Sequence, residues 1–152
     1  MKTMVLGIGN SIRCDDGVGP YTASLLKAMS LPIDAHIDTA STIGLNLLDL
    51  LEDCERAFVI DSMTDSKHKN GTVLRFTAAE LDSINKDEYS HHNLGLTQTL
   101  SFGRQNGLKM PRDIVIYAIC AENVNNFGEG LSLEVEKGAR QAARQILEEI
   151  SS

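Results

Sequence analysis

The chain has 152 residues, a formal net charge of −7, 42% hydrophobic residues and 23% charged residues. This length predicts a single domain, residues 1–152, with a real hydrophobic core, and the composition is typical of a globular protein. The acidic balance, without any cluster of Lys and Arg, disfavours nucleic acid and anionic membranes as partners. No apolar run approaches the roughly 20 residues of a membrane span. Met1 leads directly into a predicted strand rather than a signal peptide, so we expect a cytoplasmic protein.

The first half of the chain alternates apolar strands with amphipathic helices. Lys2–Ile8 is largely apolar, which is typical of a strand buried on both faces in a parallel sheet. A helix follows, with Pro20 at an early position and an end near Leu31-Pro32. The next predicted elements are a strand at Ala35–Asp38, a turn-rich segment, a helix with apolar residues from Ile43 to Leu51, and a strand at Ala57–Ile60.

The second half contains one strand of a different character. After a polar loop closed by Asn70-Gly71, residues 72–76 alternate between apolar and polar, which indicates an edge or hairpin strand and a candidate for antiparallel pairing. A long polar connection then leads to the last elements, a helix from Leu94 to about Gly107, a strand at Ile114–Ile119 and a helix from about Ser132 to Ile150. The alternation predicts a three-layer αβα domain with a mostly parallel sheet.

The turn after the first strand carries the most informative residues. Gly7, Gly9 and Asn10 form a Gly-x-Gly-Asn turn, and Asp15 and Asp16 follow it. This turn is similar to a dinucleotide-binding fingerprint, but an isoleucine stands where the third glycine is needed, and two carboxylates would repel a pyrophosphate. The carboxylates fit a metal ion or a cationic group better.

Two further segments supply candidate metal ligands. Asp61 follows the strand Ala57–Ile60, and ligands of open α/β sheets bind beyond the carboxyl ends of the strands. His91-His92 stands before a later helix in a third loop, and if this loop lies on the same side of the sheet, it adds imidazole to the two carboxylates. Two carboxylates and an imidazole suit nickel, zinc or iron, with positions left open for water or substrate.

Each of these residues also has a purely structural interpretation. Asp15 or Asp16 can cap the first helix, Asp61 can belong to a turn, and the glycines can serve the backbone alone. His91-His92 can be a solvated pair that caps a helix. A thiol nucleophile at Cys14 is disfavoured, because neighbouring carboxylates suppress a thiolate. Three cysteines without Cys-x-x-Cys spacing predict reduced thiols.

Four segments together resemble the [NiFe]-hydrogenase maturation endopeptidases in order and spacing. They are Gly7-Ile8-Gly9-Asn10, Asp15-Asp16-Gly17-Val18-Gly19, Val59-Ile60-Asp61-Ser62 and His91-His92-Asn93-Leu94-Gly95-Leu96. The resemblance extends over nearly the whole chain. It implies a five-stranded sheet with one antiparallel strand and helices on both faces. It also implies an enzyme that removes a short C-terminal extension from a hydrogenase large-subunit precursor after nickel insertion.

The resemblance further implies roles for individual residues. By position, Asp16, Asp61 and His92 match the set that contacts nickel in that family. The nickel is then held by the precursor and acts as a recognition signal, and no nucleotide is needed. The family usually has Asp-Gly-Gly-Thr in a substrate-recognition loop after the second strand, and the matching residues here are Asp38, Thr39, Ala40, Ser41 and Thr42.

This last segment departs from the family pattern, because both early glycines are absent. Side chains at positions 39 and 40 are expected to reshape the cleft, which leaves the class of hydrogenase open. Two other functions also stay open, a non-catalytic metal-binding or chaperone-like module and a nucleotide-binding α/β protein.

Overall fold

A central mixed sheet organises the protein. The computed structural model describes residues 2–12, 14–41, 44–64, 67–81, 92–122, 128 and 130–152, with the backbone alone at 81 and 92–95. In these residues the strand order is β2-β1-β3-β5-β4. The strands are β1 (Thr3–Ile8), β2 (Ala35–Ala40), β3 (Arg56–Met63), β4 (Val73–Thr77) and β5 (Asp113–Cys120). Only β4 pairs antiparallel among them, with β5, as its alternating sequence indicated.

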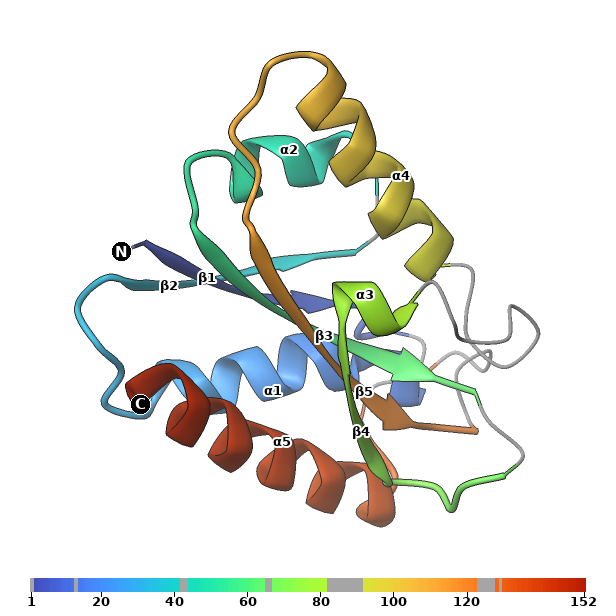
Figure 1. Ribbon diagram of the computed structural model, residues 1–152. Coiled ribbons are helices and arrows are strands. Elements are labelled where there is room, and N and C mark those ends of the chain that lie inside the picture. The colour runs from blue at the N-terminus through green and yellow to red at the C-terminus, as the bar shows by residue number, and fades with distance from the viewer. Residues whose placement is uncertain are drawn as a thin grey trace.

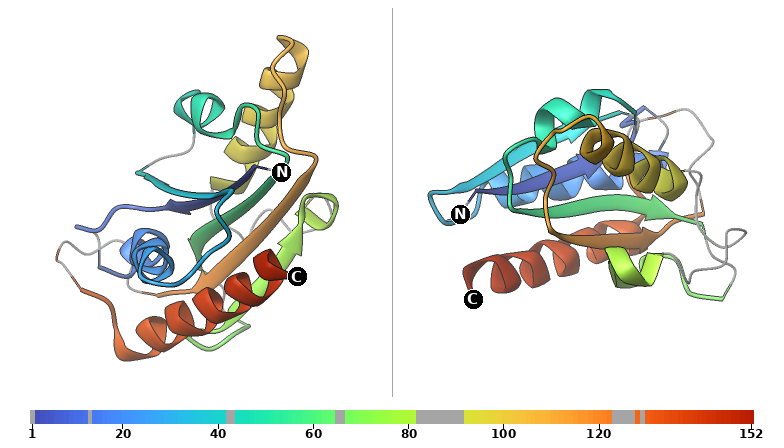
Figure 2. Two further views of the ribbon diagram at one scale, coloured as in Figure 1. Left: turned by 90° about the vertical axis from the view of Figure 1, so that its left-hand side faces the viewer. Right: turned by 45° about the horizontal axis from the view of Figure 1, so that its top comes forward.

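Helices cover both faces of the sheet, which confirms the predicted αβα fold. α1 and α5 lie on one face, and α2 and α4 lie on the other (Figures 1 and 2). The helical segments are η1, a 3-10 turn (Cys14–Gly17), α1 (Val18–Lys27), α2 (Asn46–Leu51), α3 (Ala78–Leu81), α4 (His92–Gln105) and α5 (Leu133–Ser151). None of the helices in the described ranges is long and apolar enough to cross a membrane.

The core consists of two apolar clusters, one on each face. Strand alternation produces this division, since successive side chains of β1 point to opposite faces. Leu6 and Ile8 of β1 pack with α2 and α4, whereas Val5 packs with α1 and α5. β1, β3 and β5 are almost entirely buried, which explains their continuously apolar sequences.

Several predicted boundaries were wrong, and two of them concern candidate site residues. β2 continues to Ala40 rather than ending at Asp38, because β1 supplies a partner at every position up to Ile8 and Gly9 N–H donates to Ala40 O at 3.0 Å. Thr39 and Ala40 therefore lie in a strand instead of a turn, and Asp38 lies within the strand, as predicted, rather than at its end. Asp61 likewise lies within β3, since pairing with β5 continues to Met63.

The helices also differ from the predicted ranges. α1 ends at Lys27 rather than near Leu31, and α2 begins at Asn46 rather than near Ile43, which lies outside the described residues. The short helix α3 falls where a polar connection was expected. The three cysteines are free thiols, as predicted.

Candidate functional site

The glycine turn brings η1 and α1 against the end of β1. Gly9 has φ +149°, which side chains rarely adopt, and a Cβ at this position would lie 2.0 Å from the carbonyl oxygen of Asp16. A Cβ on Gly7 would lie 2.4 Å from the carbonyl oxygen of Gly19. Packing inside the protein therefore accounts for both glycines without a phosphate. The nucleotide-binding alternative loses the support that it drew from this turn.

Asp15 has a structural role. Its side chain is buried, Oδ1 accepts a hydrogen bond from Ser132 N–H at 2.7 Å, and Oδ2 accepts one from the Ser132 hydroxyl at 3.0 Å. Ser132 is the N-cap residue of α5, so Asp15 fastens η1 to the start of the last helix. The predicted capping of the first helix is wrong, because α1 begins after Gly17 without a side-chain cap.

Asp16 points to the sheet and meets β3. Its Oδ2 accepts a hydrogen bond from Asn10 N–H at 2.9 Å, and its Oδ1 accepts one from the Ser62 hydroxyl at 3.0 Å. Ser62 N–H in turn donates to Asp61 Oδ1 at 2.8 Å. Asp16 is 8% exposed and Asp61 1%, so both carboxylates are buried. The structure thus brings these two predicted residues to a common neighbour, although they lie on different elements.

Ser62 was not recognised as a site residue from the sequence. Its position next to Asp61 was the one available signal. Neighbouring side chains of a strand point to opposite faces, so the two residues must face different helical layers. Ser62 therefore turns toward η1 and α1. Asp61 shares its face with Val59 and Met63, which pack in the cluster under α2 and α4.

His92 begins α4, the helix that packs on the face to which Asp61 turns. The other end of α4 lies at the amino edge of the sheet, since Arg104 Nη2 donates to the carbonyl of Pro111 at 3.1 Å, just before β5. The helix has 14 residues and rises about 21 Å, so its first turn lies toward the carboxyl edge (Figure 1).

The complete metal set stays a prediction. The side chain of His92 and all of His91 lie outside the described residues. Within the described residues, no three His, Cys, Asp or Glu side chains form a group suited to a metal ion. Of the predicted substrate-binding segment, Asp38, Thr39 and Ala40 lie in β2, Ser41 follows it, and Thr42 lies outside the described residues.

Comparison with known proteins identifies the family. The model of the hydrogenase maturation protease family matches residues 20–149. The chain is 26% identical over 148 residues to the hydrogenase 2 maturation protease of Escherichia coli K12, which covers 97% of this chain and 89% of the relative. It is 31% identical over 150 residues to a protein of Methanocaldococcus jannaschii named as a candidate hydrogenase maturation protease, covering 97% and 95%.

Solved structures show the same fold. The hydrogenase maturating endopeptidase HybD of Escherichia coli superimposes with a TM-score of 0.86 and 26% identity, covering 99% of this chain and 93% of HybD. HybD of Thermococcus kodakarensis gives 0.83 and 26%, covering 100% of both chains. The sheet order and its helical layers are those of a HybD-like α/β protease. The chain belongs to the hydrogenase maturation protease family.

Proposed function

We propose that this protein removes the C-terminal extension of a [NiFe]-hydrogenase large-subunit precursor after nickel has been inserted. In this proposal Asp16, Asp61 and His92 contact the nickel held by the precursor. Family membership gives the reaction class, an endopeptidase of hydrogenase maturation. The assignment of the residues is supported by one observation above others: the buried carboxylate of Asp16 accepts a hydrogen bond from Ser62, the residue that follows the buried Asp61 in β3.

The charge of this pair favours a cation. Asp16 and Asp61 are both buried, and burial of a carboxylate charge is costly unless it is compensated. A cation bound by these carboxylates reduces that cost. Each carboxylate oxygen of Asp16 accepts one hydrogen bond from the described residues and keeps a lone pair for a further ligand. The carboxylate of Asp16 is therefore oriented by Asn10 and Ser62 and still able to bind.

The number of ligands explains why the nickel belongs to the substrate. Affinity for a metal depends on the number and type of ligands, and two carboxylates with one imidazole form a weak nickel site. Ligands in the precursor complete the coordination only when nickel has already been inserted. The metal then acts as a recognition signal that delays cleavage until the precursor is loaded.

A processing assay with loaded and empty precursor tests this proposal. The enzyme is treated with chelator and desalted, then mixed with nickel-loaded or apo precursor, and mass spectrometry follows the precursor's C-terminus. We expect cleavage of the loaded form alone, with no rescue of the apo form by metal added to the enzyme. Equal cleavage of the apo precursor would overturn nickel recognition.

The same assay separates the remaining alternative. An unchanged C-terminus in the presence of bound nickel-loaded precursor would favour a non-catalytic metal-binding module. The cytoplasmic location stays a prediction from the sequence.

A further inference from the structure

We propose that the precursor's C-terminal extension binds as an added strand along the outer edge of β2, antiparallel to β2. This inference rests on the proposed function and names how the same site holds its substrate. It follows from the hydrogen-bonding pattern of β2, from a groove beside it, and from the connection between β2 and Asp16.

The outer edge of β2 offers backbone groups for pairing. In the described part of the chain, β2 pairs only with β1, in parallel. Thr3 N–H donates to Asp34 O and Gly9 N–H donates to Ala40 O, so the even-numbered residues of this stretch turn their backbone groups toward β1. The N–H and C=O groups of Ile37 and Thr39 consequently point away from the sheet.

A shallow, open groove runs beside this edge. Its volume is about 450 Å³, and it lies between the end of α1 and the first half of β2. Polar atoms make up most of its open surface, and its lining includes Lys27, Leu31, Ile33, His36 and Ile37. Ile33 is fully exposed, which is costly for a large apolar side chain with no partner. Alternate side chains of an added strand would lie over this groove and cover it.

The end of β2 is close to the proposed nickel-contacting residues. Ala40 O accepts from Gly9 N–H, and the next residue, Asn10, donates its N–H to Asp16. Neighbouring strands lie about 4.8 Å apart, so an added strand lies about 10 Å from β1 and its glycine turn. A polypeptide with its nickel at Asp16 can therefore reach the edge of β2 within a few residues.

The direction of the added strand follows from the chemistry. The extension begins at the scissile bond, which lies with the nickel at the carboxyl edge of the sheet. It can follow β2 only by running from that edge toward the amino edge, which is antiparallel to β2. The six residues of β2 pair with an extended segment of similar length, about 20 Å.

The carboxylate of Asp38 disfavours pairing of this edge with a second copy of the chain. Its exposed carboxylate accepts a hydrogen bond from Thr39 N–H at 2.8 Å and so covers one outward donor. Charged side chains on edge strands suppress unwanted pairing. The incoming extension replaces this local bond with a bond between strands.

A proline substitution tests the inference. Ile37→Pro removes an outward N–H and leaves the ladder with β1 intact, because proline is tolerated on edge strands at such positions. Val73→Pro is the matched control, since the bond from Cys120 N–H to Thr72 O turns the N–H of Val73 outward at the other edge of the sheet. Thermal melts confirm that both variants are folded. With nickel-loaded precursor, we expect Ile37→Pro to raise KM about fivefold to tenfold with kcat little changed, and Val73→Pro to match the wild type.

A precursor with a shortened extension makes the test specific. An extension cut to two residues beyond the scissile bond is too short to pair with β2. The wild-type KM should therefore rise, and the difference in KM between the wild type and Ile37→Pro should vanish. A penalty that persists on the shortened precursor, or wild-type kinetics of Ile37→Pro on the full precursor, would overturn the added strand. Thr39→Pro, a second variant at the same edge, should behave like Ile37→Pro.

Two controls keep this inference separate from the proposed function. If the wild type fails to cut nickel-loaded precursor, the proposed function is wrong; if it cuts and Ile37→Pro cuts equally well, only the added strand is wrong. Sedimentation of the protein without precursor tests whether a second copy of the chain occupies this edge instead. A wild-type dimer that Ile37→Pro dissociates would show that a second copy occupies this edge, and would overturn the proposal.

Discussion

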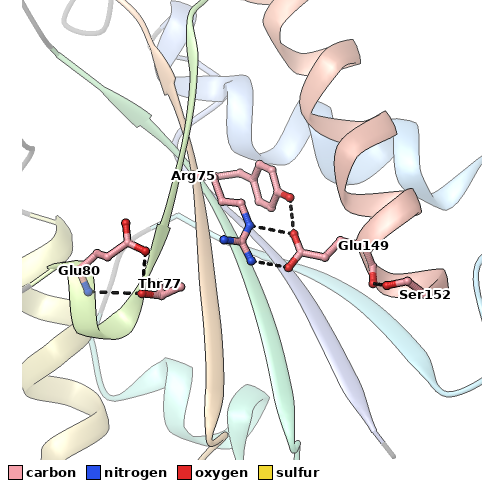
Figure 3. Close-up of polar contacts among 6 residues, drawn as sticks. Arg75, Thr77, Glu80, Glu149 and Ser152 are labelled. Carbon is pink, nitrogen blue, oxygen red and sulfur yellow. Dashed lines mark hydrogen bonds and ion pairs between the residues drawn. The ribbon is translucent and has the colours of Figure 1, made fainter.

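Two polar clusters on the same apolar sheet differ in charge balance. In the first cluster, between α5 and the strands β4 and β5, Arg75 of β4 donates from Nε and Nη2 to the two carboxylate oxygens of Glu149 on α5, at 3.0 and 2.6 Å (Figure 3). The Tyr117 hydroxyl donates to the same carboxylate at 2.5 Å. Burial raises the pKa of Tyr117 to about 12, so its hydroxyl remains a donor at neutral pH. Positive and negative charges match in this cluster.

At the carboxyl edge the group shared by two carboxylates is neutral. The Ser62 hydroxyl donates a hydrogen bond to Asp16, and the Ser62 N–H donates one to Asp61. Ser62 itself carries no positive charge. A matched cluster fastens a helix to a sheet, whereas burial of the Asp16 carboxylate beside a neutral hydroxyl costs stability. Such a local cost is typical of a functional site. The comparison therefore predicts that the first cluster serves stability and the second serves activity.

The largest expected effect follows removal of the predicted nickel contacts. Asp16→Asn, Asp61→Asn and His92→Ala should each lower kcat/KM for the nickel-loaded precursor more than about 100-fold, because even indirect partners of metal ligands cost 10- to 100-fold. The melting temperatures of the two Asn variants should stay equal to the wild type or rise, since each substitution replaces a buried charge by a neutral amide.

Asp15→Asn is the matched control for these variants. It removes a neighbouring carboxylate that bonds Ser132 of α5, so it should lower the melting temperature by several degrees and retain processing below that temperature. Full activity in Asp16→Asn, or loss of activity in a folded Asp15→Asn, would reverse the assignment.

A smaller loss is expected when Ser62 is changed. Ser62→Ala removes the hydroxyl that orients Asp16, and it should lower kcat/KM about 10- to 100-fold, as for other residues that position a metal ligand. Ser62→Thr keeps a hydroxyl and should restore most of this loss. A merely structural role would give the opposite result, with Ser62→Ala less stable and equally active.

Breaking the cluster of Arg75, Tyr117 and Glu149 should change stability and leave processing unaltered. Glu149→Gln removes the ion pair with Arg75. The side chain of Arg75 is 45% exposed and that of Glu149 is 26% exposed. Partly exposed ion pairs contribute about 1 kcal/mol or less. We therefore expect a fall in melting temperature of about 2–4 °C, measured by differential scanning calorimetry. A drop in kcat/KM would show that this cluster also supports the site.

The smallest expected effect is a pH dependence of the difference in melting temperature between the wild type and Glu149→Gln. The hydrogen bond from Arg75 lowers the pKa of Glu149 below its ordinary value. A lowered carboxyl pKa contributes stability above the unfolded-state pKa of about 4.3, and this contribution is lost as the pH falls through the folded-state pKa. The gap in melting temperature between wild type and Glu149→Gln should therefore shrink as the pH falls from about 6 to about 3. A gap that stays constant would show that charge does not cause it.

The sequence by itself determined the fold class and the residues that carry the family resemblance. The continuously apolar segments in β1, β3 and β5 require burial on both faces, and the alternating segment in β4 requires an edge. These are local patterns whose physical consequence is nearly independent of the rest of the chain. The same holds for the glycine turn, because a backbone at positive φ selects glycine.

Only the tertiary structure decided what the two adjacent aspartates do. Asp15 and Asp16 are chemically equivalent in the sequence, yet one bonds Ser132 and the other bonds Ser62, at separations of 117 and 46 residues. The ends of β2 and β3 also escaped the local pattern, because a strand continues for as long as its neighbours supply hydrogen-bonding partners. Partners distant in the chain thus determined which carboxylate faces β3 and that Asp38 lies on an edge strand. Hydrogen bonds depend on the positions of residues in space, and local sequence patterns do not encode those positions.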